Sequence, residues 1–253
     1  EWQQVERARA LLAREVGYVR KPHGGRLRVA LAFPNTYFVG MSNLGLQTVY
    51  RLFNAQPDIV CERVFLPPKS ELAEQVASGA PMVTIESQTP VRDFDIFAFS
   101  VSFEWDYTNV VTMLRLAGIP PRADARTHHD PLVMIGGAVT FVNPEPLALF
   151  ADVIAAGEGE ALIPPLLRAF KESSDRDDLL RRLTDAGVEL ALVSSNSYDN
   201  VRRILAQAER ADDGWKSGAV AGGYWLREPA PGAEAALVES GAIAPEALAA
   251  WDA

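Results

Sequence analysis

Small polar residues and glycines follow several short apolar runs, and residues of these types could bind a flat or phosphate-bearing ligand. Amide, hydroxyl and carboxylate side chains can hydrogen-bond a ligand. Glycines let the backbone approach it closely, because they carry no Cβ. The candidate cofactor-binding residues are Asn35, Thr36, Tyr37, Gly40, Ser100, Ser102, Gly136, Gly137, Gly157, Glu158 and Gly159.

Each candidate also has a purely structural interpretation, which stays open at this point. The segment 35–40 could be a turn whose residues serve backbone geometry alone. Gly137 could allow tight packing at the end of a strand. The hydroxyls of Ser100 and Ser102 could satisfy neighbouring backbone groups, and Glu158 could stabilise a helix N-terminus without any ligand.

The chain has a single cysteine, which excludes several kinds of site. One thiol cannot form a disulfide within the chain, a four-cysteine zinc site or a self-contained cysteine-ligated iron–sulfur cluster. Cys61 lies in an apolar run, so we expect it to be buried as a small hydrophobic residue. His128 and His129 offer two ligands where zinc takes three or four, so we expect no metal site. No catalytic residue is assigned.

Two aromatic residues follow the most apolar run, 94–101. Trp105 and Tyr107 could flank a flat cofactor such as a corrin or an adenine. Aromatic side chains in such positions more often pack in the core, and that is our expectation for both.

Apolar runs of strand length alternate with amphipathic segments, which predicts βαβ units with right-handed crossovers. In the resulting parallel sheet the carboxyl ends of all strands share one edge, where ligands bind. The sequence thus predicts an α/β fold: an open Rossmann-like parallel sheet of about five strands flanked by helices, with a smaller α/β tail. Val16 and Leu44 are expected on the buried faces of their helices. The expected strands are 28–34, 59–66, 94–101, 131–135 and 152–156, and the expected helices are 1–20, 42–54, 71–77, 106–116 and 162–170.

The character of the sequence changes near residue 173, which predicts a domain boundary. We expect an N-terminal helix and lead-in at 1–27, the five-stranded unit at 28–172 and a tail at 173–253, with residues 173–175 as a linker. Within the tail we expect helices at 176–186, 197–208 and 245–251, and strands at 188–193, 222–228 and 235–238.

Composition and charge narrow the class of protein. Of the 253 residues, 48% are hydrophobic and 23% are charged, which is typical of a globular protein. The net charge of −9 argues against nucleic acid as a partner. No run approaches the roughly 20 apolar residues that span a bilayer, and the charged residues 1–20 do not form a signal peptide. We therefore expect a cytoplasmic protein without a membrane partner.

Four blocks of sequence carry a resemblance to a known family. Together they resemble the N-terminal domain of a family of radical S-adenosylmethionine (SAM) proteins, over about residues 20–172. In that family this domain is similar to the cobalamin-binding (B12-binding) domain of B12-dependent enzymes, and a TIM-like barrel with a Cys-x3-Cys-x2-Cys motif follows it. The blocks are 29–45, 61–67, 94–104, and 136–137 with 143–146 and 157–160.

The sequence departs from the family pattern in two places. With one cysteine, the chain cannot supply the three thiolates of a SAM-cleaving iron–sulfur cluster. It also lacks the Asp-x-His-x-x-Gly motif that presents an axial histidine to cobalamin, because His23, His128 and His129 do not fit it. The resemblance then implies an accessory domain with cobalamin as its candidate cofactor. It implies no iron–sulfur cluster and no catalysis of its own, and the radical SAM barrel or another protein as its partner.

The tail resembles fragments of other families. Residues 186–197 and 200–203 resemble the second motif of haloacid-dehalogenase-type phosphatases, but the nucleophile motif Asp-x-Asp is missing. Residues 222–228 and 235–241 resemble the C-terminal domain of transketolase-like and pyruvate dehydrogenase enzymes. Three hypotheses follow: a cobalamin-binding-like accessory domain, a docking or scaffold module without a cofactor, and a phosphatase-like enzyme, which the missing motif disfavours.

Overall fold

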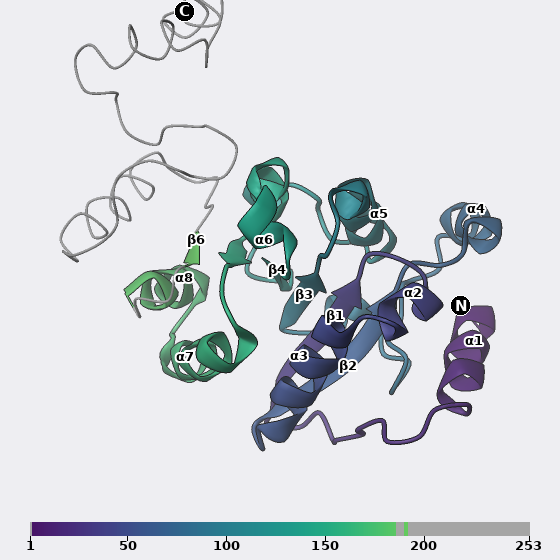
Figure 1. Ribbon diagram of the computed structural model, residues 1–253, viewed down its shortest axis with the longest axis horizontal. Helices are drawn as coiled ribbons and strands as arrows, with labels where there is room; N and C mark the ends of the chain where they lie inside the picture. Colours follow the sequence, from purple (N-terminus) through teal and green to yellow (C-terminus); the bar gives the residue numbers. More distant parts are fainter. Residues whose placement is uncertain (1, 186–189, 192–253) are drawn as a thin grey trace, which may run out of the picture. The chain divides into compact units, whose positions relative to one another are not determined.

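A computed structural model describes residues 2–185 and 190–191 of the chain (Figure 1). All of these residues belong to one unit of the chain, Glu1–Gln207. The helices and strands expected at 197–208, 222–228, 235–238 and 245–251 lie outside the described residues.

Five parallel strands form the sheet, which confirms the predicted α/β fold. The strand order is β2-β1-β3-β4-β5-β6, and the short β6 pairs with β5 in the antiparallel direction. Every residue of β2 is buried, as expected for a parallel strand covered on both faces. The strands are β1 (Leu27–Phe33), β2 (Ile59–Phe65), β3 (Ile96–Ser100), β4 (Leu132–Gly136), β5 (Val153–Ala155) and β6 (Leu190–Ala191).

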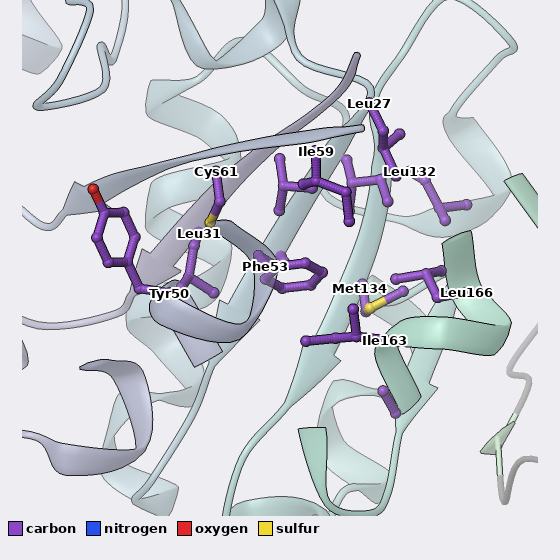
Figure 2. Packing of buried hydrophobic residues seen from close by; sticks show 14 of the residues in the cluster. Leu27, Leu31, Tyr50, Phe53, Ile59, Cys61, Leu132, Met134, Ile163 and Leu166 are labelled. Carbon is purple, nitrogen blue, oxygen red and sulfur yellow. The ribbon is translucent and has the colours of Figure 1, made fainter. Parts of the chain in front are cut away.

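Helices cover both faces of the sheet. Side chains alternate along each strand, so apolar side chains project from both faces and pack against the helices there. In β1, Leu31 and Phe33 pack into a core with α3, α7 and α8, part of which Figure 2 shows. Ala30 and Ala32 point to the other face and pack with α5. The helices are α1 (Trp2–Leu12), α2 (Tyr37–Met41), α3 (Leu44–Ala55), α4 (Lys69–Ser78), α5 (Tyr107–Leu116), α6 (Val139–Val142), α7 (Gly159–Glu172) and α8 (Arg176–Asp185), with 3-10 turns η1 (Val91–Asp93), η2 (Glu104–Asp106), η3 (Ala123–Ala125) and η4 (Glu145–Phe150).

Two helices differ from the prediction. The N-terminal helix ends at Leu12 instead of continuing to residue 20, and Val16 is fully exposed rather than inward-facing. A turn at Gly17, whose φ is +87°, takes the chain away from the helical path. The segment 35–40 was expected as a loop, but α2 begins within it at Tyr37.

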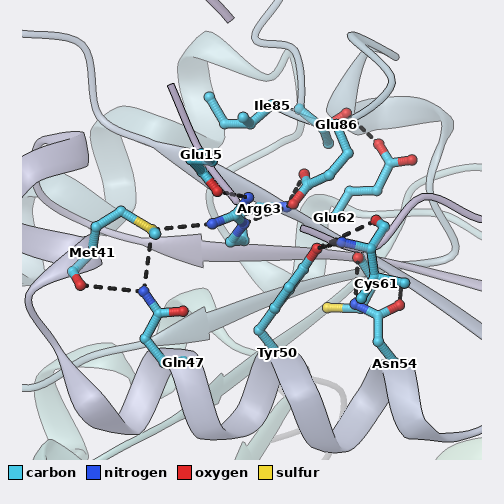
Figure 3. A network of polar contacts seen from close by, with 12 residues as sticks. Glu15, Met41, Gln47, Tyr50, Asn54, Cys61, Glu62, Arg63, Ile85 and Glu86 are labelled. Atoms are coloured by element: carbon cyan, nitrogen blue, oxygen red, sulfur yellow. Dashed lines mark hydrogen bonds and ion pairs between the residues drawn. The ribbon is translucent and has the colours of Figure 1, made fainter. Parts of the chain in front are cut away.

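An ion cluster in the interior explains why the N-terminal helix stops early (Figure 3). The Arg63 side chain in β2 is 2% exposed and pairs with Glu86 through Nε at 2.6 Å. Its Nη2 pairs with Oε2 of Glu15 at 2.7 Å, and its guanidinium lies 4.6 Å from the ring centre of Tyr50. Because buried charge is tolerated only when paired, Glu15 must turn inward, which fixes the lead-in residues 13–26 against the sheet.

The boundary predicted at residue 173 falls between two helices that share one core. Leu179 and Leu183 of α8 are buried in the cluster that contains α7. Arg176 also pairs with Asp152, directly before β5, at 2.5 Å. A separate tail beginning at 173 stays a prediction, but α8 packs as part of the five-stranded unit.

Leu183→Ala tests whether α8 belongs to this unit. Leu183 is 1% exposed, so its truncation should lower the free energy of unfolding by about 2–5 kcal/mol, the usual range for a buried leucine. The half-exposed Leu149 provides the control, and Leu149→Ala should change it by less than about 1 kcal/mol. If Leu183→Ala and Leu149→Ala change the free energy of unfolding equally in urea, a tail that folds separately is favoured.

Arg63→Met should destabilise the protein in a pH-dependent way. Burial raises the pKa of Glu86 to about 6 even though Arg63 acts to lower it. Without Arg63 the folded-state pKa of Glu86 rises further above its unfolded value, so the folded state binds the proton more tightly. Stability is then lost as pH rises through that pKa.

We therefore expect a penalty of about 3–5 kcal/mol at pH 8 and a smaller one at pH 5, measured by urea unfolding. In Arg63→Met/Glu86→Leu, where that carboxylate is gone, the pH dependence of the penalty should shrink. A penalty in Arg63→Met that is the same at both pH values would contradict this account of Glu86.

Candidate functional site at the carboxyl edge of the sheet

The strand order places a topological switch point between β1 and β3. From β1 the chain crosses to β2 on one side, while β3 lies on the other side of β1. In open α/β sheets of this order, ligands bind outside the carboxyl ends of the strands at the switch point. The loops that leave the sheet there are residues 34–36 and 101–103, so this edge is the first place to look for a site.

A buried carboxylate joins the two loops at the switch point. Asn35, after β1, donates through Nδ2 to Oδ1 of Asp106 at 3.0 Å. Asn109, in the first turn of α5, donates to the same oxygen at 3.0 Å and to the carbonyl of Pro34 at 2.9 Å. Asp106 is 3% exposed, and burial raises the pKa of its carboxyl group while the two amide donors oppose that rise. The network holds the β1 loop against the start of α5.

A second polar contact links the loop after β3 to the connection between β1 and α3, at a point beyond α2. Asn43 donates through Nδ2 to Oγ of Ser102 at 3.0 Å. Its Oδ1 accepts from the backbone N–H of Leu46 at 2.9 Å and so caps the N-terminus of α3. Ser102 is thus a tether between the loops, and its hydroxyl is already hydrogen-bonded within the protein.

The candidates after β1 divide into edge residues and packing residues. Asn35 lies in the switch-point network, and Thr36 precedes α2 with its N–H bound to Oδ1 of Asn35 at 2.8 Å. Tyr37 instead donates to Oε1 of Glu15 at 2.7 Å, and its pKa is raised to about 12 by burial and by that glutamate. Gly40 packs against Phe65, because a Cβ there would come within 2.4 Å of that ring.

The candidates after β3, β4 and β5 are placed along the same edge. Ser100 is buried at the end of β3 and pairs in register with Gly136 at the end of β4. A Cβ on Gly137 would lie 2.6 Å from the carbonyl oxygen of Val101, so this glycine lets two backbones meet. The remaining candidates, Gly157, Glu158 and Gly159, lie at the start of α7, where the Glu158 side chain is exposed and makes no capping bond.

Large apolar side chains are exposed after three neighbouring strands. Trp105 is 85% exposed, so the prediction that it packs in the core is wrong, whereas Tyr107 is partly buried and donates to the carbonyl of Asn143. Leu44, expected to face inward, is 79% exposed. We call the exposed apolar residues of this edge the docking face: Phe38, Val39 and Leu44 after β1, Phe103 and Trp105 after β3, and Phe141 and Val142 after β4.

The histidines and the cysteine lie away from this edge. His23 binds Glu62 at 2.8 Å, and His128 and His129 precede β4 at the opposite edge. Cys61 is buried, as predicted, and burial raises the pKa of its thiol. Across residues 2–185 and 190–191, no three His, Cys, Asp or Glu residues are grouped so that they could hold a metal ion.

Three residues of the site were missed by sequence reasoning: Asn43, Asp106 and Asn109. Asp106 was taken only as the first residue of a helix. The available signal was its position directly after the central strand, with an amide three residues later on the same helical face. Asn43 carried an N-cap signal just before Leu44, but its tether to Ser102 joins residues 59 positions apart, which a local pattern does not reveal.

Comparison with known families supports part of the resemblance. The family described as radical SAM proteins, N-terminal, matches residues 45–191, more than half of the chain. The chain therefore belongs to this family of N-terminal domains of radical SAM proteins. The match runs past residue 172 through α8 to β6. No curated protein matched the chain.

In the described part of the chain, no helix combines the length and the apolar character needed to cross a bilayer.

Gly137→Ala should lower stability through packing at the strand end. The new Cβ would collide with the Val101 backbone, and the φ of +99° is unfavourable for alanine. We expect a loss of about 2–4 kcal/mol from strain and overpacking. Gly24→Ala is the control, because nothing lies within 4 Å of a Cβ there. Thermal unfolding with equal melting temperatures for both variants would contradict the packing role.

Proposed function

We propose that this domain is an accessory domain that docks onto the catalytic domain of a radical SAM protein through its docking face. The observation that carries the proposal is the exposure of apolar side chains after β1, β3 and β4, all at one edge. Exposed apolar groups that gather on one surface mark interaction sites more often than isolated ones do. The family assignment supports this choice of partner, since these domains are the N-terminal parts of radical SAM proteins.

The polar contacts behind the face support docking. The Asn35–Asp106 and Asn43–Ser102 bonds tie the connection after β1 to the segment between β3 and α5, which pre-orders the backbone beneath Phe103 and Trp105. A pre-ordered surface loses less conformational entropy on binding. Aromatic residues dominate the binding energy of protein interfaces, so Trp105 is the expected anchor.

A corrinoid bound at the same edge is the second candidate. The exposed ring of Trp105 beside the switch point favours it, because an aromatic face could lie against a flat macrocycle. His23, His128 and His129 lie elsewhere, so the residues at this edge fit a corrinoid held by apolar and backbone groups rather than by an imidazole. When bound, the cofactor would supply the demanding chemistry, and this domain would bind and orient it.

Trp105→Ala tests docking against a matched exposed tryptophan. We expect at least tenfold weaker binding to the radical SAM catalytic domain of a family protein that carries both domains, measured by calorimetry. Trp2→Ala, on α1, should change the affinity less than twofold, because Trp2 is also exposed but lies outside the docking face. Both variants should keep the melting temperature of the wild type.

The same proteins separate the two candidates. If the wild type does not bind the catalytic domain, the docking proposal fails. If hydroxocobalamin at low micromolar concentration then shifts its absorption spectrum on mixing, and Trp105→Ala abolishes the shift, the corrinoid candidate takes its place. Under the docking proposal the spectrum is the sum of the separate components.

A further inference from the structure

The carboxylate of Asp106 has one fully used oxygen and one unused oxygen. Oδ1 accepts from Asn35 and Asn109, each at 3.0 Å. Oδ2 is enclosed and has no hydrogen-bond partner within the part of the chain that the structure describes. An enclosed carboxylate oxygen without a donor destabilises the folded state, because it has lost its water and gained nothing in return.

Helix capping does not account for this aspartate. Asp106 occupies the N-cap position of α5, where aspartate normally accepts from backbone N–H groups of the first turn. Here its side chain makes no capping bond. The second oxygen is therefore not used by the helix that it precedes.

Asp106 directly follows residues of the docking face in the sequence. Phe103, Glu104 and Trp105, which directly precede Asp106, are all exposed. Asn143, at the end of α6, has a second enclosed oxygen, Oδ1, that also has no partner among the described residues. Because both of these oxygens accept hydrogen bonds, a ligand that pairs with them must donate hydrogen bonds.

We propose that Oδ2 of Asp106 accepts a hydrogen bond from a cationic side chain, lysine or arginine, of the radical SAM domain that docks on this face. The inference rests on the proposed function and identifies the chemistry of its central polar contact. A carboxylate binds a cationic donor more strongly than a neutral one, and the exposed ring of Trp105 can receive the same cation on its face. The chain's net charge of −9 favours approach of a basic surface.

Access requires only a local change. Oδ2 is enclosed in the free domain, so docking exposes it through movements of the side chains in the turn 103–105, while the backbone of that turn stays ordered. The exposed side chains of that turn have little packing to lose. The Asn35 and Asn109 bonds to Oδ1 stay in place and keep the carboxylate oriented.

Asp106→Asn separates binding from stability. The amide keeps the shape and an oxygen for Asn35 and Asn109, but it removes the charge and the unused acceptor. We expect 10- to 100-fold weaker docking to the catalytic domain and a melting temperature that is unchanged or higher. Glu104→Gln removes an exposed negative charge two residues away and should change docking less than twofold.

The outcomes distinguish this inference from the docking proposal. If the wild type docks and Asp106→Asn docks equally well, the Asp106 contact is wrong while docking stands. If the wild type does not dock, docking itself is wrong and the contact falls with it. If Asp106→Asn has a lower melting temperature than the wild type, Leu183→Ala serves as the reference, because it lowers stability away from the docking face. The Asp106 contact is then supported only if Asp106→Asn loses more docking affinity than Leu183→Ala does.

Discussion

The buried charge of Arg63 is the constraint on which the edge of this domain depends. Its guanidinium sits in β2 at 2% exposure, where an unpaired cation would be strongly unfavourable. Glu86 and Glu15 neutralise it from two different segments, and Met41 accepts from Nη1 at 3.1 Å. One side chain thus fixes the lead-in, the segment that contains Glu86 and the end of α2. These segments are not paired with each other in the sheet.

Glu15 extends this constraint to the docking face. One of its oxygens binds Arg63 and the other accepts from Tyr37, each at 2.7 Å. Tyr37 begins α2, which carries the exposed Phe38 and Val39. The family match begins at residue 45, so residues before the matched region help to build the face on which docking is proposed.

The sheet was predictable because its signals are local, whereas the site was not. Buried parallel strands are largely apolar runs, although β2 also holds Glu62 and Arg63, and β1 to β5 were found within a few residues of their true ends. The early end of α1 was missed because it depends on an ion pair between Glu15 and Arg63, 48 positions apart. Leu44 and Trp105 were expected in the core, since sequence pattern gives apolar character but not exposure. The glycines lie at the carboxyl edge of the sheet, yet Gly40 and Gly137 are explained by internal packing.

The polar contacts beneath this edge account both for the order of its loops and for the exposure of its apolar side chains. Asn35, Asn43, Ser102 and Asn109 place their hydrogen bonds within the protein, and the apolar side chains of the same loops are left on the outside. Such an arrangement is unfavourable for an isolated domain and favourable for one that meets a partner, because the face is ordered before contact. Asp106 is a stronger example of such an arrangement, because its enclosed second oxygen lowers the stability of the free domain. Retaining the carboxylate is understandable when a donor arrives from outside the domain.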